Sequence, residues 1–245
     1  MSDRWAAFAE EHANARTGYS GELYEVIANF GLRRDAAILD IGCGTGLAAQ
    51  PFIENGFRVT GVDSSDAMLA AARARHPNAT FVRGTAEALP FPDERFDVAI
   101  GAQTFQWLDR ARAIAEAYRV LRRGGIIAVW WKHLMANDPV KDLRDDLLRS
   151  MQTEPVEEGL GGGFKEFYAS AFTQQTLRVI PWRIAMPLEE YLRYERSRYA
   201  VRNALGKRAD EFFRALQQRL RERTGAENPT LSLAFIQYLY LAKKP

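Results

Sequence analysis

The chain has 245 residues, of which 47% are hydrophobic and 26% are charged, and its formal net charge is +2. This length predicts one well-filled α/β domain with an insertion, and the near balance of charge gives no indication of a nucleic-acid partner. Cys43 is the single cysteine, which excludes an internal disulfide and a cysteine-based zinc site and is typical of a reducing compartment.

At the N-terminal end, residues 1–5 lack the basic-then-apolar pattern of a signal peptide. No apolar run approaches the roughly 20 residues of a membrane span, so we expect a soluble cytoplasmic protein without a membrane partner. Residues 3–30 predict helix, broken at 17–21 and resuming from Glu22 to Asn29. We expect residues 1–30 to form a helical cap over one edge of a sheet.

An apolar run over 37–41 leads into three glycines at alternate positions. These are Gly42, Gly44 and Gly46. The run predicts a strand buried on both faces, and a helix-like segment follows from Leu47 to Glu54. Glycine lets a ligand approach the backbone, and the N–H groups at a helix start favour an anion. With Asp40 before the turn, the pattern suits a zwitterion, its carboxylate toward the helix and its ammonium toward Asp40.

Two other nucleotide motifs fit this stretch less well. A dinucleotide fingerprint expects glycine or alanine where Leu47 stands, and a P-loop is excluded because no Gly-Lys-Ser/Thr follows. The stretch from Ala37 to Leu47 resembles motif I of the class I S-adenosylmethionine (SAM) dependent methyltransferases, in which the methionine part of SAM lies over this loop. Relatives carry an Arg…Gly-Tyr segment before motif I. The resemblance therefore implies that Arg16 and Tyr19 help to close the cofactor pocket.

The next β-rich run ends in an acid, Asp63, about one strand–helix–strand unit beyond Gly42. Both should lie at the carboxyl edge of neighbouring parallel strands, where open α/β sheets bind ligands. A carboxylate there accepts hydrogen bonds from both ribose hydroxyls, a role shared by NAD and SAM sites. The resemblance adds Ser64 and Met68 as adenine contacts. Asp66 is predicted to cap the following helix.

A third strand is predicted to end at Gly84, before a loop with two prolines. This loop resembles the family's adenine-recognition segment, usually Gly-Asp-Ala-Glu-x-Leu-Pro-Phe, with Thr85 in place of the aspartate. A hydroxyl accepts from the adenine amino group more weakly than a carboxylate, so we expect a modest cofactor affinity. The resemblance places Glu87 in the same site, together with the backbone N–H of Ala86 facing adenine N1.

The fourth predicted strand is buried and runs into polar and aromatic residues, at the end where a parallel sheet exposes functional groups. These residues resemble the Gln-x-Phe-His-Trp-Phe/Leu-Asp motif of the type 11, ubiquinone-methyltransferase-like group, which acts on small molecules. Gln106 stands where those relatives commonly have histidine. The resemblance assigns Gln103 to the cofactor, and Phe105, Gln106 and Trp107 to the floor of the methyl-transfer site. Core packing is the alternative for Trp107.

The later elements are expected as helix 111–122 ended by the glycine pair 124–125, strand 125–131, helix 141–152, strand 176–186, helices 188–203 and 208–223, and strand 231–241. The family resemblance is continuous from motif I to about Trp131 and thins beyond His133. The glycine-rich segment 159–163 is either a surface connection or the hinge of a lid that excludes water.

Basic side chains outnumber acidic ones between residues 193 and 223. One interpretation is a solvated helix face. The other is an anion-binding patch, in which Arg198 and Arg202, one helical turn apart, reach a substrate carboxylate. The residues Ser197-Arg198-Tyr199 partly match a Ser-Arg-Ser/x-Tyr segment that packs over the active site in relatives.

A general base would come from one of three histidines. His12 lies in the predicted cap, and His76 is expected to face solvent. His133, after the fifth strand, is the best placed of the three and is our candidate catalytic residue.

These patterns predict an α/β fold, a seven-stranded, mostly parallel doubly wound (Rossmann-like) sheet with a helical N-terminal cap and a helical insertion late in the chain. The single domain, 1–245, divides into the cap (1–30), a cofactor-binding core (36–132), substrate-covering segments (133–225) and a final strand (229–243). The sequence leaves the oligomeric state open.

The expected function is methyl transfer from SAM to a small-molecule acceptor by in-line displacement, without a metal. The acceptor atom is oxygen, carbon or nitrogen, a carboxylate among the choices. The alternative is a SAM-binding protein without turnover, acting as a sensor or partner subunit. A nucleic-acid methyltransferase is disfavoured because the fourth strand lacks an Asn/Asp-Pro-Pro-Tyr motif.

Overall fold

The computed structural model describes residues 17–151 and 164–245. Three residues or segments with predicted roles, Arg16, His12 and the glycine-rich segment 159–163, lie outside this range. The predicted N-terminal cap is described from Thr17 onward. No helix within the described residues is both long enough and apolar enough to cross a membrane.

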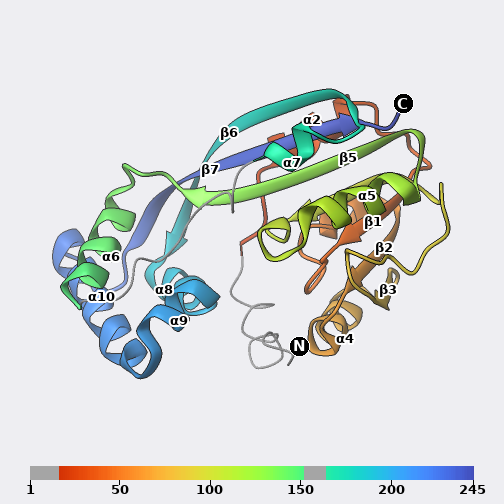
Figure 1. Ribbon diagram of the computed structural model, residues 1–245. Helices are drawn as coiled ribbons and strands as arrows, with labels where there is room; N and C mark the ends of the chain where they lie inside the picture. Colours follow the sequence, from red (N-terminus) through yellow and green to blue (C-terminus); the bar gives the residue numbers. More distant parts are fainter. Residues whose placement is uncertain (1–16, 152–163) are drawn as a thin grey trace.

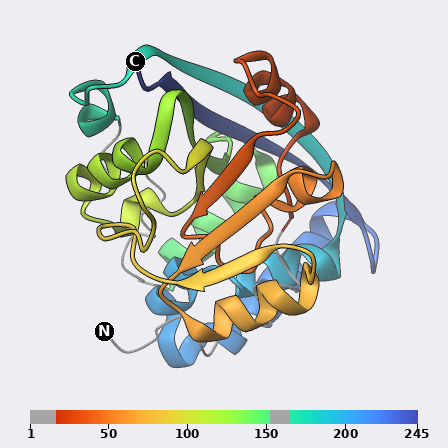
Figure 2. The same ribbon diagram turned by 90° about the vertical axis from the view of Figure 1, so that its right-hand side faces the viewer.

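The strands of the described residues form one seven-stranded sheet in the order β3-β2-β1-β4-β5-β7-β6. The strands are β1 (Ala37–Ile41), β2 (Arg58–Asp63), β3 (Thr80–Arg83), β4 (Phe96–Ala102), β5 (Leu121–Leu134), β6 (Thr173–Pro187) and β7 (Thr230–Lys243). The first five strands in this order are parallel, and β7 runs antiparallel to both β5 and β6. Figure 2 shows the arrowheads of β1, β2 and β3 pointing the same way. The predicted mostly parallel sheet is therefore confirmed.

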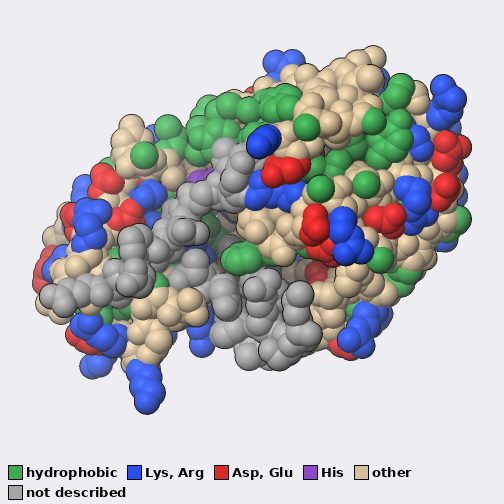
Figure 3. All heavy atoms as spheres, in the orientation of Figure 1, with side chains coloured by type: hydrophobic (Ala, Val, Ile, Leu, Met, Phe, Trp, Pro, Cys, Tyr) green, Lys and Arg blue, Asp and Glu red, His purple; other side chains and the backbone are tan. Residues whose placement is uncertain are grey.

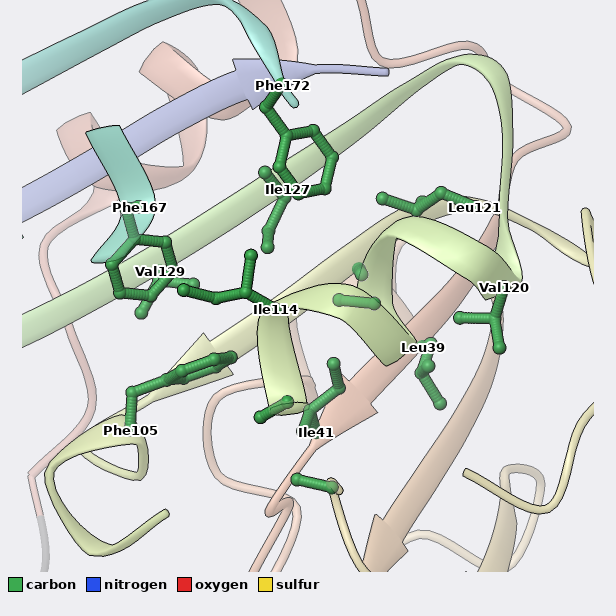
Figure 4. Packing of buried hydrophobic residues seen from close by; sticks show 14 of the residues in the cluster. Leu39, Ile41, Phe105, Ile114, Val120, Leu121, Ile127, Val129, Phe167 and Phe172 are labelled. Atoms are coloured by element: carbon green, nitrogen blue, oxygen red, sulfur yellow. The ribbon is translucent and has the colours of Figure 1, made fainter. Parts of the chain in front are cut away.

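Helices cover both faces of this sheet. They are α2 (Gly21–Asn29), α3 (Gln50–Glu54), α4 (Asp66–Arg75), η2 (Phe105–Trp107), α5 (Arg110–Val120), α6 (Pro139–Ser150), α7 (Lys165–Tyr168), α8 (Leu188–Arg196), α9 (Tyr199–Leu205), η3 (Gly206–Arg208) and α10 (Ala209–Thr224). On one face, α5 and α7 enclose an apolar cluster, which Figure 4 shows with Ile114 of α5 directed toward Val129 of β5. On the other face, Leu23 and Ile27 of α2 pack with residues of α3. Helices on both faces make the sheet doubly wound, as predicted.

The last three strands extend well beyond the parallel part of the sheet. Figure 1 shows β5, β6 and β7 continuing to the side, where α6, α8, α9 and α10 form a separate group. We call these four helices the helical lobe, and β1 to β4 with the start of β5 and their covering helices the core lobe. Tyr191, Phe212 and Phe235 are buried in the helical lobe's own apolar cluster. This lobe is the helical insertion that the sequence predicts.

Charged side chains of both signs are interspersed over the face shown in Figure 3, on both lobes. Such an arrangement fits the formal net charge of +2 and forms no large field of one sign on this face.

Several predicted element boundaries are wrong, each for a local reason. The helix after the glycine turn begins at Gln50 rather than Leu47, with Pro51 in its first turn. The glycine pair does not separate helix from strand, because β5 starts at Leu121 and Gly124 (φ +75°) lies at a shift in the pairing of β4 with β5.

One capping prediction and one helix prediction are also corrected. The cap of α4 is Ser65, whose hydroxyl accepts from Met68 N at 3.3 Å, whereas Asp66 lies inside the first turn. The predicted helix 188–203 is two helices, α8 and α9. It breaks where the Ser197 hydroxyl donates to the Tyr194 carbonyl at 2.7 Å and Arg198 adopts an extended backbone.

Candidate functional site

The glycine turn after β1 has a backbone that only glycine adopts without strain. Gly42, Gly44 and Gly46 have φ values of +65°, +53° and +78°. A Cβ on Gly42 would lie 2.1 Å from the Thr104 hydroxyl oxygen, so no side chain fits there. Among residues 17–151 and 164–245, a Cβ on Gly44 would meet nothing within 4 Å, so this part of the chain leaves space beside the Gly44 backbone. The turn is thus closed on its protein side and accessible at its centre.

Asp63 lies directly beside this turn, because Val62 pairs with Ile41 in neighbouring parallel strands. One Asp63 carboxylate oxygen accepts from Gly44 N at 2.9 Å, and the other accepts from Ser65 N at 2.9 Å. The structure therefore brings together the glycine turn and the acid at the carboxyl edge of the sheet. These backbone bonds fix the orientation of the carboxylate.

Asp40 is the acid beneath the turn, and its side chain is 0% exposed. Among the described residues, neither of its carboxylate oxygens has a hydrogen-bond partner. Burial, and secondarily the charge of Asp63, raise the pKa of Asp40 well above its usual value. The Thr45 hydroxyl is also buried without a partner in this part of the chain. Buried polar groups of this kind are rare, and a ligand or an ordered water usually completes them.

The predicted adenine contacts lie around the same edge with different exposures. Ser64 and Thr85 are exposed, and Ala86 is buried. Met68 is also buried, so its side chain is covered in this structure. One carboxylate oxygen of Glu87 accepts from Asp109 N at 3.1 Å, which ties the loop to the start of α5. Their roles toward a ligand stay predictions.

Gln103, after β4, has a left-handed backbone (φ +54°) and is fixed by β5. Its N–H donates to the Trp130 carbonyl at 3.0 Å, and its side-chain amide donates to the Lys132 carbonyl at 2.7 Å. Gln106 is fixed as well: its amide donates to the Gln103 carbonyl at 2.9 Å and accepts from the Trp131 indole at 2.8 Å. Gln106 is thus occupied by protein contacts.

The other two residues of the predicted floor differ sharply in exposure. Phe105 is fully buried, and its ring centroid lies 5.1 Å from that of Phe167, so its assignment as a substrate contact is corrected to a core residue. A Cβ on Gly101 would lie 2.6 Å from the Phe105 ring, which shows how tightly the ring is enclosed. Trp107 is 42% exposed, so the alternative of core packing is wrong for this residue.

The predicted anion-binding pair is also different in the structure. Arg198 donates from one nitrogen to both oxygens of Glu195, at 3.1 and 2.9 Å, and Glu195 is 0% exposed. Arg144, itself buried, donates to Glu195 at 3.1 Å. Arg202 does lie one turn further, with its N–H bonded to the Arg198 carbonyl at 3.1 Å. Arg198 therefore belongs to a buried ion cluster of the helical lobe rather than to a surface patch.

The described histidines occupy unlike environments. His133 is partly buried near the end of β5, with its ring centroid 6.3 Å from that of Tyr238. His76 is 7% exposed, so its predicted solvent exposure is wrong. It packs beneath the glycine turn, where a Cβ on Gly46 would lie 2.7 Å from the imidazole. Burial, and secondarily Arg75, lower the pKa of His76. Within residues 17–151 and 164–245, no group of three His, Cys, Asp or Glu side chains is placed to hold a metal ion.

Two residues at the site are missing from the sequence-based set. Tyr24 of α2 donates its hydroxyl to the Ala48 carbonyl at 3.1 Å, which joins the N-terminal segment to the glycine turn. Burial raises the pKa of Tyr24, and Tyr19 and Asp40 add to the shift. Lys132 is buried at the end of β5 and bonds the N-terminal segment. A lysine directly after an apolar strand run is the one signal that marks it in the sequence.

Comparison with known proteins places this site in a recognised domain. Residues 39–129 match the family model described as a methyltransferase domain. An uncharacterized methyltransferase of Mycobacterium tuberculosis is 35% identical over 131 residues, which cover 54% of this chain and 53% of that protein. A malonyl-[acyl-carrier protein] O-methyltransferase of Serratia marcescens is 41% identical over 91 residues, covering 37% of this chain and 36% of that protein. The chain thus spans about half the length, or less, of these curated relatives.

Solved structures share the fold over more of the chain. A proposed type II methyltransferase of Anaeromyxobacter dehalogenans superposes with a TM-score of 0.74 at 24% identity, covering 93% of this chain and 97% of that one. A phosphoethanolamine N-methyltransferase of Haemonchus contortus, solved with phosphomonomethylethanolamine and S-adenosylhomocysteine, has a TM-score of 0.57 at 20% identity. It covers 100% of this chain and 58% of that one. At these identities the likeness concerns the fold.

Proposed function

We propose that this chain, which belongs to the class I SAM-dependent methyltransferases, transfers a methyl group from SAM to a small-molecule acceptor by in-line displacement. One observation carries the proposal. A buried carboxylate without a partner among the described residues, Asp40, lies beneath a glycine turn whose open centre, Gly44, is bonded to Asp63. A ligand with an ammonium group and a ribose would supply what this arrangement lacks.

The residues present fit SAM by their chemistry. Asp40 would face the cationic end of the methionine part, and Asp63 would accept from the ribose hydroxyls. Ser64 and the loop at Ala86 would lie at the adenine. SAM supplies a methyl group already activated by a sulfonium, so the protein's task is to bind, orient and exclude water. Orientation of this kind contributes up to about 7–11 kcal/mol of barrier reduction in well-aligned reactions.

The acceptor we favour attacks without prior deprotonation, as a carboxylate or a neutral amine does. Gln106 supports this choice, because it replaces the histidine of relatives and both ends of its amide are bonded within the protein. Some relatives are named malonyl-[acyl-carrier protein] O-methyltransferases, which methylate an oxygen. For an acceptor that does need a base, His133 is the proposed proton acceptor.

The second candidate is a SAM-binding protein without turnover. The replacement of aspartate by Thr85 in the adenine loop, and of histidine by Gln106, favours it. Titration calorimetry with SAM and S-adenosylhomocysteine (SAH), followed by a methyl-release assay over small acids, phenols and amines, separates the two. Turnover of any acceptor supports the enzyme, and binding without turnover supports the sensor. Binding of NAD in place of SAH would overturn both.

A further inference from the structure

A buried lysine at the end of β5 holds the segment that precedes α2. The Lys132 side chain is 5% exposed. Its ammonium donates to the Thr17 carbonyl at 2.9 Å, to the Thr17 hydroxyl at 2.6 Å and to the Gly18 carbonyl at 2.8 Å. An ammonium has three donors and no acceptor, so these three oxygens match its full donor set.

Four aromatic rings surround the same ammonium. The Lys132 nitrogen lies between 5.1 and 5.8 Å from the ring centroids, within the range at which a cation is attracted to a ring face. The rings are those of Tyr19, Trp182 of β6, Tyr194 of α8 and Phe235 of β7. One side chain therefore contacts the N-terminal segment, the long strands and the helical lobe at once.

A second contact fastens the same segment to the sheet. Gln237 of β7 pairs with Lys132 across the strands, and its amide accepts from Ser20 N at 3.1 Å and donates to the Ser20 hydroxyl at 2.6 Å. Beyond this point α2 begins, and the Tyr24 hydroxyl reaches the Ala48 carbonyl next to the glycine turn. The segment before α2 is thus held by Lys132 and Gln237, and α2, which follows it, contacts the residue next to the glycine turn of the predicted cofactor site.

Two predicted cofactor residues depend on Lys132 in different ways. Gln103 bonds the Lys132 carbonyl, which any residue at this position would keep. Tyr19 lies against the Lys132 ammonium, and its ring meets Trp130 edge-on at 5.4 Å. A substitution at position 132 therefore releases Thr17 to Tyr19 and leaves Gln103 in place.

We propose that Lys132 is a positioning residue that sets cofactor affinity by fixing Thr17 to Tyr19, the residues that lead into α2 and its contact with Ala48 next to the glycine turn. This inference rests on the proposed function. A buried cation carries a desolvation cost that an apolar side chain in the same space would avoid. An apolar side chain would fill the same space without this cost, but it would not bind the oxygens of Thr17 and Gly18. We therefore infer that the lysine is present to hold this segment in place.

The test is Lys132→Met, which keeps an unbranched stem and removes the three donors. We expect faster hydrogen exchange in peptides covering residues 17–29 of the ligand-free protein, and about tenfold weaker SAH binding by calorimetry, since hydrogen bonds to a charged group are lost. The matched control is Lys244→Met. Lys244 is 8% exposed, bonds the Leu121 carbonyl at 2.7 Å and contacts Tyr118, at the other end of β5. This control should bind SAH like the wild type.

If Lys132→Met does not fold, a milder variant can test the same proposal. Thr17→Val removes one of the three acceptors and keeps the shape, so the same two changes should appear in smaller size. Wild-type SAH affinity in the folded variant overturns the proposal, even if exchange is faster, because Lys132 would then serve structure alone. If the wild-type protein does not bind SAH, the proposed function is wrong, and so is the inference that Lys132 sets cofactor affinity. The exchange experiment needs no ligand and still decides whether Lys132 holds the segment.

Discussion

The glycine turn of the core lobe and the ion cluster of the helical lobe each contain a completely buried acid, Asp40 and Glu195. The two acids differ in whether the described residues supply a hydrogen-bond partner. Glu195 is held by Arg144 and Arg198. Asp40 has no hydrogen-bond partner among the described residues, and burial, with the charge of Asp63 as a second cause, raises the pKa of Asp40. A buried acid that the protein satisfies itself holds helices together, whereas one that it leaves unsatisfied marks a place for a ligand.

The two lobes also differ in how far their sequences match the methyltransferase family model, although solved structures share the fold over most of the chain. The methyltransferase model matches residues 39–129, which lie in the core lobe, and the helical lobe is outside the match. A turn that must present its backbone to a ligand restricts the residues that can form it. A helical cluster that packs apolar side chains can be built from many sequences. The helical lobe, which lies in the segments predicted to cover the substrate, is therefore expected to be the less recognisable part in sequence.

Glu195→Gln should give the largest effect, confined to stability. Removing this charge breaks the ion pairs of Glu195 with Arg144 and Arg198, and breaking a buried pair costs about 3–5 kcal/mol; we expect the lower end of this range, because Asp145 still accepts from Arg144 at 2.7 Å. Urea unfolding measures the loss, and SAH affinity should stay at the wild-type value. Glu211→Gln, which removes an exposed partner of Arg208, is the control and should change little. Loss of SAH binding with unchanged stability would instead put the ion cluster in the ligand site.

Asp63→Ala should abolish most SAH binding while the protein stays folded. Two ribose hydrogen bonds to a carboxylate, at about 1.5 kcal/mol each, correspond to about a hundredfold weaker binding. Calorimetry gives the affinity, and circular dichroism checks the fold, because Asp63 also orders Gly44 and Ser65. Asp66→Ala, an exposed acid at the start of α4, serves as the control. Wild-type affinity in Asp63→Ala would remove this residue from the site.

Two glycine substitutions in the same turn should separate an effect on stability from an effect on ligand affinity. Gly42→Ala puts a Cβ 2.1 Å from the Thr104 hydroxyl on a backbone that is itself left-handed (φ +65°), and we expect a stability loss of about 2–5 kcal/mol in urea unfolding. The methyl of Gly44→Ala lies within 4 Å of no atom of the described residues, so this variant loses only about 1–2 kcal/mol for its left-handed backbone, but the methyl occupies the proposed ligand space. SAH affinity should therefore fall in Gly44→Ala by more than its stability does. Equal SAH affinity in Gly44→Ala and the wild type would place the ligand elsewhere.

The smallest expected effect is a pH dependence from Asp40. Its pKa in the folded protein is raised above the usual value of 3.8, so the folded state binds the proton more tightly than the unfolded chain. This contribution to stability is complete below that value and is lost as pH rises toward the folded pKa. The ligand-free protein should lose stability over this range, and Asp40→Asn should not show this loss.

Ligand binding should reverse the protonation of Asp40. A cationic ammonium nearby favours the carboxylate, so SAH binding should release a proton, measured as a binding enthalpy that changes with the ionisation enthalpy of the buffer. Asp40→Asn should show no such release from this group. The same release in the variant as in the wild type would mean that another group titrates.

The sequence correctly predicts the positions of those site residues that lie on consecutive elements of the chain. The glycine turn and Asp63 belong to consecutive strands, so hydrophobic runs and glycine spacing place them together. Even the wrong cap of α4 missed by one residue, because Ser65 and Asp66 both have capping side chains.

The rest depends on partners far apart in the chain. Gln106 is fixed by Trp131, and His76 is covered by the turn at Gly46. Arg198 binds Glu195 within its own segment, but Glu195 is also held by the distant Arg144. The surroundings of the Lys132 ammonium come from four separate places in the sequence, from Thr17 to Phe235. Periodicity reports which face of an element is buried and does not report which distant side chain meets it.

The central claim is that the glycine turn, flanked by Asp40 and Asp63, holds the amino-acid and ribose parts of SAM. A crystal structure of the protein with SAH tests it most directly. We expect the ribose hydroxyls within hydrogen-bond distance of the Asp63 carboxylate and the methionine part over Gly44. A site without SAH density under saturating ligand, or SAH bound elsewhere in the molecule, would contradict the claim.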